Sequence, residues 1–377
     1  MDTPEQILKR YWGYDHFRPP QSEIIASVLA GKDVVALLPT GGGKSVCFQV
    51  PSMILDGVCL VITPLIALME DQVSQLKRRG IAAIAIHSGM SRGEIDIALD
   101  NCAYGKIKFL YLSPERIQTD LFLGRIEKIK VNLIAVDEAH CISQWGYDFR
   151  PSYLLIADLK ALKPDVPTIA LTATATKEVK SDIIEKLKLD QPGVYSKSFA
   201  RENLSFVVRE TENKEKLLLQ VLQKVNGAAI VYVRSRKATE KLSAWLSKNK
   251  VSATFYHAGL THNQRNEHQL KWIDGDDRVM VATNAFGMGI DKANVRTVIH
   301  MDLPETLEAY YQEAGRAGRD GKRSYAVIIF HPLDVKSLRD KVEQSQPEID
   351  QLKKTYQALS NYFQLAEGSG MGESFDF

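Results

Sequence analysis

The chain has 377 residues, with 48 basic and 46 acidic side chains and a formal net charge of only +2. A chain of this length is long for one domain and sufficient for two, each with its own hydrophobic core. The near balance of charge excludes a protein that binds nucleic acid through a general excess of basic residues, so any such contact must be local.

Cysteine spacing and the N-terminus exclude two further classes. Cys47, Cys59, Cys102 and Cys141 are widely spaced, which fits neither a C-x-x-C metal site nor a disulfide-rich secreted scaffold. Residues 1–10 are polar and charged, and the chain has no apolar stretch of about 18 residues that could span a membrane. We therefore expect reduced thiols, no membrane partner and a soluble intracellular protein.

Residues 1–30 favour helices and contain three side chains suited to a purine base. The amide of Gln21 can both donate to and accept from an adenine edge, while Tyr14 and Arg18 offer flat surfaces for stacking. Without context, an aromatic helix end packed on the core would be the preferred interpretation. The short distance to the next motif makes an adenine pocket plausible.

That motif, residues 38–45 (Leu-Pro-Thr-Gly-Gly-Gly-Lys-Ser), follows an apolar run and precedes a stretch with helical potential. Glycines let backbone N–H groups turn toward a phosphate at a helix N-terminus, Lys44 can reach the β- and γ-phosphates, and the Ser45 hydroxyl can bind Mg²⁺. The strict P-loop pattern has a glycine where this chain has Leu38. The residues predicted to bind ATP here are Thr40, Gly41, Gly42, Gly43, Lys44 and Ser45.

Short apolar strands then alternate with helical stretches, which is typical of a parallel sheet covered by helices. Ligands of such sheets bind at the carboxyl ends of the strands. The expected strands are 58–62, 82–86, 109–112, 133–136 and 168–171, and the expected helices are 65–79, 92–102 and 177–187. The hydroxyl residues after the last of these strands, residues 172–176, can bond the preceding acidic segment or cap a helix.

An acidic pair, Asp137 and Glu138, ends the apolar strand at 133–136. Next to a phosphate-binding loop, Asp137 can hold Mg²⁺ through water, and Glu138 can orient and deprotonate the attacking water. A carboxylate pair that merely caps a helix is the alternative, and it loses ground because Lys44 and Ser45 lie in the same domain.

Aromatic residues crowd the loop that follows, with neither helical nor strand periodicity. Aromatic side chains on a loop can stack on unpaired bases, at about 1 to 3 kcal/mol each. A hydrophobic plug under a domain interface is equally compatible with the composition, and the proximity to Glu138 favours a nucleic-acid role. The loop residues expected to report the occupancy of a nucleic-acid strand to the acidic pair are Gln144, Trp145, Tyr147, Phe149 and Arg150.

The alternation breaks at residues 190–203, where we place the linker between two domains. A second alternating series follows, and it has no Gly-Lys-Ser loop. Near its end, residues 312–321 are predicted to be helical, with Arg316 and Arg319 on one side facing phosphates across an interface. We divide the chain into domain 1 (1–199), domain 2 (200–333), and a helical tail with a flexible end (334–377).

The motifs FRPPQ, PTGGGKS, TPLIALMEDQ, LSPERI, DEAH, CISQWGYDFRPSY, LTATA, VATNAFGMGID and YYQEAGRAGRDG occur in this order. Together they resemble superfamily 2 helicases and specifically the RecQ family, over about residues 8–340. The resemblance implies an α/β fold of two tandem RecA-like domains, and ATP-driven unwinding of DNA with 3′ to 5′ polarity in repair and recombination. It further implies ATP and Mg²⁺, single-stranded and partially duplex DNA as partners, and a cytoplasmic location that is nucleoid-associated in a bacterium. We expect a monomer.

The resemblance also implies residue roles. Tyr14, Arg18 and Gln21 would bind adenine. Asp137 and Glu138 would be the metal holder and the base. The remaining catalytic roles fall to Lys44, to Arg319 as an arginine finger, and to Arg316 and Gln312 beside it. Many family members continue into a four-cysteine zinc subdomain and a winged helix, and because neither pattern is present we expect no zinc site in these residues.

Rival functions are weaker but not all are excluded by the residues alone. A GTPase needs Asn-Lys-x-Asp, and residues 213–216 lack the Asp. A P-loop kinase does not need a second domain with arginines, and an inactive ATPase would be expected to have lost Lys44, Glu138 or Arg319. An RNA helicase, or a nucleic-acid-stimulated ATPase with weak unwinding, stays open, since two such domains grip a backbone without having to recognise bases.

Overall fold

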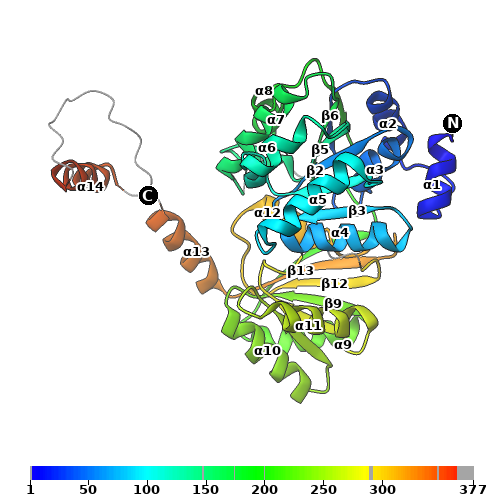
Figure 1. Cartoon of the computed structure of the whole chain (residues 1–377). Helices are drawn as coiled ribbons and strands as arrows, with labels where there is room; N and C mark the ends of the chain where they lie inside the picture. The colour runs from blue at the N-terminus through cyan, green and yellow to red at the C-terminus, as the bar shows by residue number, and fades with distance from the viewer. Residues whose placement is uncertain are drawn as a thin grey trace.

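A computed structural model describes residues 2–146, 148–173, 175–198, 200–287, 292–345 and 348–362. Tyr147 of the aromatic loop, Thr174 of LTATA and residues 288–291 of VATNAFGMGID therefore lie outside the described residues. So does the predicted flexible end, residues 363–377. Two lobes, each built on a parallel sheet, lie one above the other, and α13 extends away from the second (Figure 1).

Within the described residues, the first sheet has seven parallel strands in the order β3-β4-β2-β5-β6-β1-β7. The strands are β1 Val34–Leu37, β2 Val58–Ile62, β3 Ala83–Ile86, β4 Phe109–Leu112, β5 Val131–Val136, β6 Thr168–Thr172 and β7 Gly193–Ser196. The helices around it are α1 Pro4–Trp12, α2 Gln21–Leu29, α3 Lys44–Ile54, α4 Ile66–Arg78, α5 Arg92–Tyr104, α6 Asp120–Ile126, α7 Ile156–Leu162 and α8 Lys177–Lys186, with 3-10 turns η1 Pro114–Arg116, η2 Ala139–Ile142 and η3 Pro151–Leu155.

The second sheet has, in the part of the chain that is described, six parallel strands in the order β10-β11-β9-β12-β13-β8. The strands are β8 Leu204–Glu210, β9 Ala228–Tyr232, β10 Ala253–Tyr256, β11 Val279–Ala282, β12 Val295–His300 and β13 Ser324–Phe330. Its helices are α9 Lys214–Lys224, α10 Arg236–Lys248, α11 His262–Asp274 and α12 Leu307–Ala314, and the tail consists of α13 Pro332–Ser345 and α14 Ile349–Tyr362.

Both faces of each sheet are covered, which explains the apolar runs in inner strands such as β1, β2 and β11. In β1, Val35 and Leu37 pack into one core cluster while Val34 and Ala36 pack into another on the opposite face. The predicted alternation of strands and helices is confirmed in both halves. The fold is that of two tandem RecA-like domains followed by helices.

Two local predictions are wrong. Residues 193–196, expected to belong to the linker, form β7 at the edge of the first sheet beside β1. This strand is short and half exposed, so its sequence carries little apolar pattern. The segment after Ala314, expected to continue a helix through Arg319, leaves the helix at Gly315 and makes a series of turns.

The cysteines are reduced and buried. Burial raises the pKa of the Cys47, Cys59 and Cys102 thiols to about 12 and raises that of Cys141 further. In the described residues, no cluster of three or more His, Cys, Asp or Glu side chains could hold a metal ion. None of the described helices is long and apolar enough to cross a membrane.

Candidate active site

The glycine-rich loop connects β1 to α3 and leaves the first turn of that helix open. Gly41 and Gly43 adopt left-handed conformations, with φ of 77° and 75°, which glycine reaches without steric cost. Gly43 is the N-cap of α3, and no side chain bonds the helix N-terminus there. A helix N-terminus without a side-chain cap, together with the helix dipole, makes this a site for an anion.

Glu138 lies between two basic side chains directly after β5. Its Oε1 is 3.5 Å from Nζ of Lys44, and its Oε2 is 3.4 Å from Nδ1 of His140. The same His140 nitrogen is 2.9 Å from Oγ1 of Thr172 at the end of β6. Glu138 itself has a left-handed φ of 48°, which is uncommon for a residue with a side chain and occurs often at functional sites.

The two buried carboxyl groups have different acidities. Burial and the neighbouring Glu138 raise the pKa of Asp137 to about 6. Burial acts in the same direction on Glu138, but Lys44 and His140 outweigh it and hold the pKa of Glu138 below its ordinary value. Glu138, the group predicted to act as the base, is therefore the more acidic of the two and loses its proton first as the pH rises.

Sequence reasoning missed a buried polar chain that reaches Asp137 through helices α3 and α4 and strand β4. Gln49 of α3 donates to the Tyr111 hydroxyl over 3.2 Å, and that hydroxyl donates to Oε1 of Gln72 over 2.9 Å. Gln72 in turn hydrogen-bonds the Asp137 carboxylate. A tyrosine inside the apolar run of β4 was the available clue, but its partners are far away in the sequence.

The second lobe contributes the turn that follows α12, residues 315–321, here called the arginine turn. Arg316 is 5% exposed, and its Nη1 donates to the carbonyl of Gly287. Arg319 lies against the first lobe: a Cβ atom on Gly41 would be 3.2 Å from Cγ of Arg319. The arginine turn therefore contacts the glycine-rich loop across the gap between the lobes.

One cleft of about 200 Å³ brings the two sets of residues together. Its walls come from the glycine-rich loop, the end of β5, helix α4 and the arginine turn. The lining residues that the sequence predicted are Thr40, Gly41, Gly43, Lys44, Ser45, Asp137, Glu138, Gln312, Arg316 and Arg319. Leu68, Asp71, Gln72 and Gln75 of α4 line it as well and were not predicted.

The three residues expected to bind adenine do not line this cleft. Gln21 is buried, and its amide nitrogen donates to the carbonyls of Gly42 and Gly43 over 3.2 and 3.1 Å. Its Oε1 accepts from the N–H of Arg18, whose guanidinium donates to Gly41 O over 3.2 Å. Tyr14 is 54% exposed. Gln21 and Arg18 thus brace the glycine-rich loop from behind.

The aromatic loop presents one ring to solvent and anchors another in the core. Trp145 is 75% exposed, and Gln144 beside it is exposed too. Tyr153 is fully buried, and its hydroxyl donates to the carbonyl of Asp137 over 2.9 Å. The hydrophobic-plug hypothesis is therefore wrong for Trp145, while Tyr153 ties the loop to the acidic pair. Phe149 is partly buried.

A second cavity of about 470 Å³ connects this loop with the second lobe. Asp148 and Arg150 line it from the loop, and Arg150 is held by Asp148 over 3.0 Å. Gln312 and Arg316 line it from the other side and also line the first cleft. These two side chains therefore stand between the aromatic loop and the acidic pair.

The comparisons with known proteins agree with this arrangement. Residues 18–181 match the DEAD/DEAH box helicase model, and residues 213–321 match the helicase conserved C-terminal domain. The ATP-dependent DNA helicase RecQ of a Synechocystis strain is 41% identical over 326 residues, which cover 84% of this chain and 68% of that protein. The chain belongs to the RecQ family. RecQ of Bacillus subtilis is 45% identical over 351 residues, 92% of this chain and 59% of that protein.

Coverage of the relatives and identity to solved structures limit what the family assignment implies. The chain spans somewhat more than half the length of the first curated relatives it matches, from 56% to 59%. Among solved structures, Mycobacterium smegmatis helicase Lhr with ssDNA and AMP-PNP has a TM-score of 0.70 at 19% identity, covering 87% of this chain and 48% of Lhr. Saccharomyces cerevisiae Dbp5 with RNA and ADP BeF3 has a TM-score of 0.68 at 17% identity, covering 91% of each chain. These likenesses support the fold alone.

Proposed function

We propose that this RecQ-family chain is an ATP-dependent DNA helicase core. In this proposal it translocates on single-stranded DNA and unwinds duplex DNA with 3′ to 5′ polarity, in repair and recombination. The observation that carries the proposal is the single cleft in which Lys44, Asp137 and Glu138 of one lobe meet Arg316 and Arg319 of the other. Such a divided site suits an enzyme whose hydrolysis depends on how its two lobes are placed.

The first lobe would bind the triphosphate and prepare the nucleophile. Lys44 and the N–H groups of the glycine-rich loop would hold the phosphates. Glu138, which its lowered pKa keeps ionised, would orient the attacking water and accept its proton. The residues fit a nucleotide with Mg²⁺, because the cleft offers hard oxygen ligands and the buried Thr40 hydroxyl lacks a hydrogen-bond partner. Ser45 and Asp137 would hold Mg²⁺, which supplies positive charge to the phosphates.

The second lobe would complete the site. Arg319 would act as the arginine finger on the charge that develops at the transferring phosphoryl group, while Arg316 and Gln312 would orient the groups around it. Tyr14 and Arg18 are proposed to stack on adenine. Adenine binding by Gln21 would require its amide to release the carbonyls of Gly42 and Gly43, so the base would influence the shape of the phosphate loop.

The aromatic loop would report the presence of DNA. Trp145 is exposed and can stack on an unpaired base, with Gln144, Tyr147 and Phe149 as neighbours. The loop is bonded to Asp137 through Tyr153, and Arg150 lines the second cavity together with Arg316. DNA bound at the loop would therefore shift groups on both sides of the catalytic cleft.

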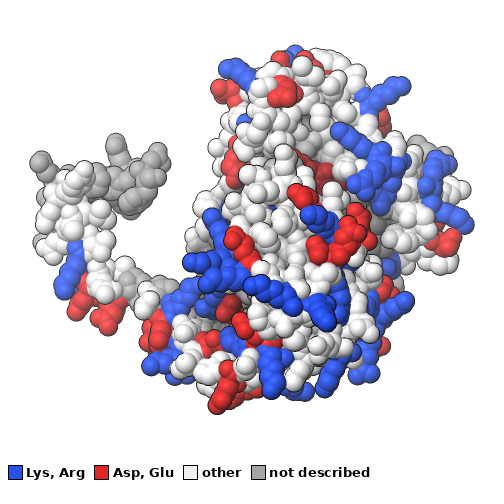
Figure 2. Space-filling view, turned by 90° about the horizontal axis from the view of Figure 1, so that it is seen from below, with Lys and Arg blue, Asp and Glu red and all other residues white. Residues whose placement is uncertain are grey.

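The choice of DNA over RNA rests on the relatives and not on the fold. The two RecQ proteins are described as DNA helicases, whereas Lhr and Dbp5 share the fold and were solved with ssDNA and RNA respectively. Charge does not decide it either: Figure 2 shows basic and acidic side chains intermixed over one face. We propose local contacts to single-stranded and partially duplex DNA, by a monomer in the cytoplasm.

The domain division at residues 199 and 200 also stays a proposal. It is supported by the position at which the chain leaves the first sheet, after Ser196, and enters the second at Leu204.

A direct test measures ATP hydrolysis with a single-stranded DNA oligonucleotide, its duplex and an RNA of the same sequence. We expect single-stranded DNA to stimulate most. Strand separation is then compared on partial duplexes with a 3′ or a 5′ single-stranded tail, and only the 3′-tailed substrate should open. Equal or stronger stimulation by RNA would favour the RNA helicase, and stimulation without strand separation would leave an ATPase with weak unwinding.

A further inference from the structure

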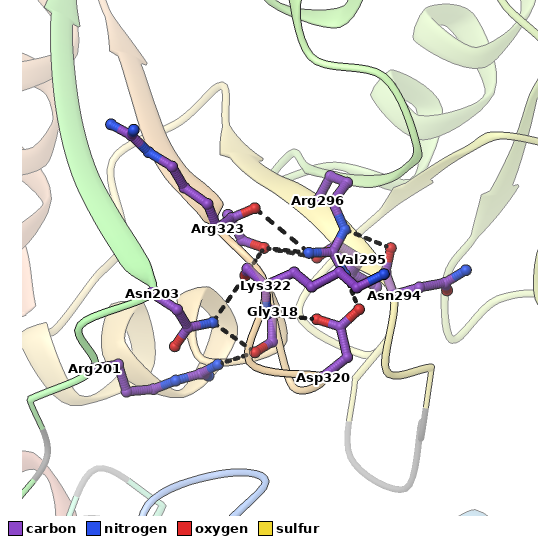
Figure 3. Close-up of polar contacts among 10 residues, drawn as sticks. Arg201, Asn203, Asn294, Val295, Arg296, Gly318, Asp320, Lys322 and Arg323 are labelled. Atoms are coloured by element: carbon purple, nitrogen blue, oxygen red, sulfur yellow. Dashed lines mark hydrogen bonds and ion pairs between the residues drawn. The ribbon is translucent and has the colours of Figure 1, made fainter.

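The segment that joins the two lobes ends in two side chains that grip the arginine turn. Nη1 of Arg201 donates to the carbonyl of Gly315 over 2.8 Å, and Nη2 donates to the carbonyl of Gly318. Nδ2 of Asn203 donates to the carbonyls of Gly318 and Lys322 over 2.8 and 2.9 Å (Figure 3). Two side chains thus bind two carbonyls of the arginine turn and one directly after it.

The turn needs such partners because it is not a helix. α12 ends at Ala314, and Gly318 has a left-handed φ of 62°. A Cβ atom on Gly318 would lie 2.5 Å from Nδ2 of Asn203 and 2.7 Å from Oγ of Ser324. The backbone of the turn is therefore pressed directly against Asn203, at a distance that only glycine permits.

A second arginine holds the opposite side of the turn. Arg296 of β12 forms an ion pair with Asp320 and donates to Oγ of Ser324 over 3.0 Å (Figure 3). The N–H of Ser324 donates back to the carbonyl of Asn203 over 2.8 Å. The arginine turn is held between Arg201 and Asn203 on one side and Arg296 on the other.

The other end of the joining segment is attached to the phosphate-binding side of the first lobe. β7 pairs with β1, with Ser196 opposite Leu37, and the N–H of Lys197 extends this pairing to the carbonyl of Leu37 over 3.1 Å. Leu37 is the last residue of β1, directly before the glycine-rich loop. Only residues 198–200 separate this pairing from Arg201.

We propose that Arg201 and Asn203 are positioning residues that hold Arg319 in register with the glycine-rich loop. The inference rests on the proposed role of Arg319 as the arginine finger. Because Arg201 and Asn203 lie at the end of the joining segment, a movement of one lobe against the other reaches the backbone of the arginine turn directly. Neither side chain lines the catalytic cleft, so both act through Arg319.

The test is a double-mutant cycle on ATP turnover at saturating single-stranded DNA. Arg201→Ala and Asn203→Asp should each lower kcat roughly 10- to 100-fold, because catalysis is sensitive to displacements of about 1 Å. The affinity for a fluorescent ATP analogue should change by less than about twofold, since the phosphate-binding loop is untouched. Arg201→Lys should recover only part of the lost turnover, because an ammonium lacks the planar geometry with which the guanidinium donates to two carbonyls at once.

Arg209→Ala is the matched control, since Arg209 is an exposed arginine of β8 that donates to its neighbour Val208.

Non-additivity decides whether the two side chains act through Arg319. In an Arg319→Ala background, Arg201→Ala and Asn203→Asp should cause no further loss of turnover. Hydrogen exchange gives a readout that is independent of activity. The amide hydrogens of residues 315–323 should exchange faster in Arg201→Ala and in Asn203→Asp than in the unmodified chain, and their exchange rate should be unchanged in Arg209→Ala.

The proposal is overturned if the losses of turnover multiply in the double variants, or if turnover is normal in Arg201→Ala. If Arg319→Ala alone retains turnover, the proposed role of Arg319 fails instead. Should Arg201→Ala not fold, Arg201→Lys and Asn203→Asp carry the same test.

Discussion

The two halves of the catalytic cleft are built in different ways. The half in the first lobe is joined by side chains that meet one another: Lys44 contacts Glu138, Glu138 contacts His140, and His140 contacts Thr172. The half in the second lobe is a glycine-containing turn whose backbone carbonyls are held from outside, by Arg201 and Asn203. The first half is assembled within one lobe, whereas in our proposal Arg319 of the second half meets the glycine-rich loop only when the two lobes are correctly positioned. We therefore expect nucleotide binding to depend on the first half and turnover on both.

The largest effect is expected from Lys44→Ala, which removes a cation from the binding half. Both the affinity for ATP and the turnover should fall, with hydrolysis reduced to background, because the ammonium compensates the phosphates in the ground state and in the transition state. Equilibrium binding of a fluorescent ATP analogue and steady-state hydrolysis measure the two effects. Undiminished turnover in a variant with a normal circular dichroism spectrum would refute the assignment.

Arg319→Ala tests the other half of the comparison. Arginine fingers contribute on the order of 10³ to 10⁵ in rate, so turnover should fall by about this factor while binding of the ATP analogue stays nearly intact. If binding is lost and turnover at saturation is normal, Arg319 belongs functionally with the binding half, and the contrast between the two halves disappears.

Trp145→Ala asks whether DNA bound at the aromatic loop is communicated to the cleft. Affinity for a single-stranded oligonucleotide should fall about tenfold, since stacking on one base is worth roughly 1 to 3 kcal/mol. Stimulation of ATP hydrolysis by the same oligonucleotide should collapse. The melting temperature should stay unchanged, because the side chain is 75% exposed. A destabilised variant that keeps DNA stimulation would contradict this assignment.

The smallest effect is expected from Tyr111→Phe, which removes one hydroxyl from the buried chain leading to Asp137. Gln49 and Gln72 would each lose a partner, at a cost of about 1 to 3 kcal/mol in the free energy of unfolding, and turnover should fall only a few-fold. Chemical denaturation and steady-state kinetics measure the two. Tyr104→Phe is the control, since Tyr104 is 72% exposed and its substitution should change neither quantity.

The parts of the molecule that could be predicted share one property: their conformation is determined by residues that are close to them in the sequence. Inner strands such as β2 and β11 are continuous apolar runs because both faces of each sheet are covered, and the glycine-rich loop is a contiguous motif. The failures involve partners from distant segments. The Tyr111 chain was missed because it joins three elements. The hydrogen bonds of the Gln21 amide to residues 42 and 43 were not foreseen either, while adenine binding by Gln21 stays a prediction.

The turn after α12 shows the same limit. A helix was predicted through residues 312–321 although glycine, which weakens a helix, occurs there at 315, 318 and 321. The conformation that forms instead depends on Arg201 and Asn203, which are more than a hundred residues away. The aromatic loop was undecided for a related reason. Composition alone cannot show that Trp145 is exposed and Tyr153 is buried. Tyr153 is held in the core by the hydrogen bond from its hydroxyl to the carbonyl of Asp137, and the sequence does not reveal that partner.

The buried thiols make the proposed lobe movement accessible to spectroscopy. With every cysteine buried and its pKa raised, the thiolate that reacts with maleimide dyes is scarce at neutral pH. The unmodified chain is therefore a nearly silent background for labelling. One cysteine introduced at an exposed position of each lobe, such as Tyr104 and Leu270, would give a donor–acceptor pair whose energy transfer follows the distance between the lobes as ATP and DNA are added.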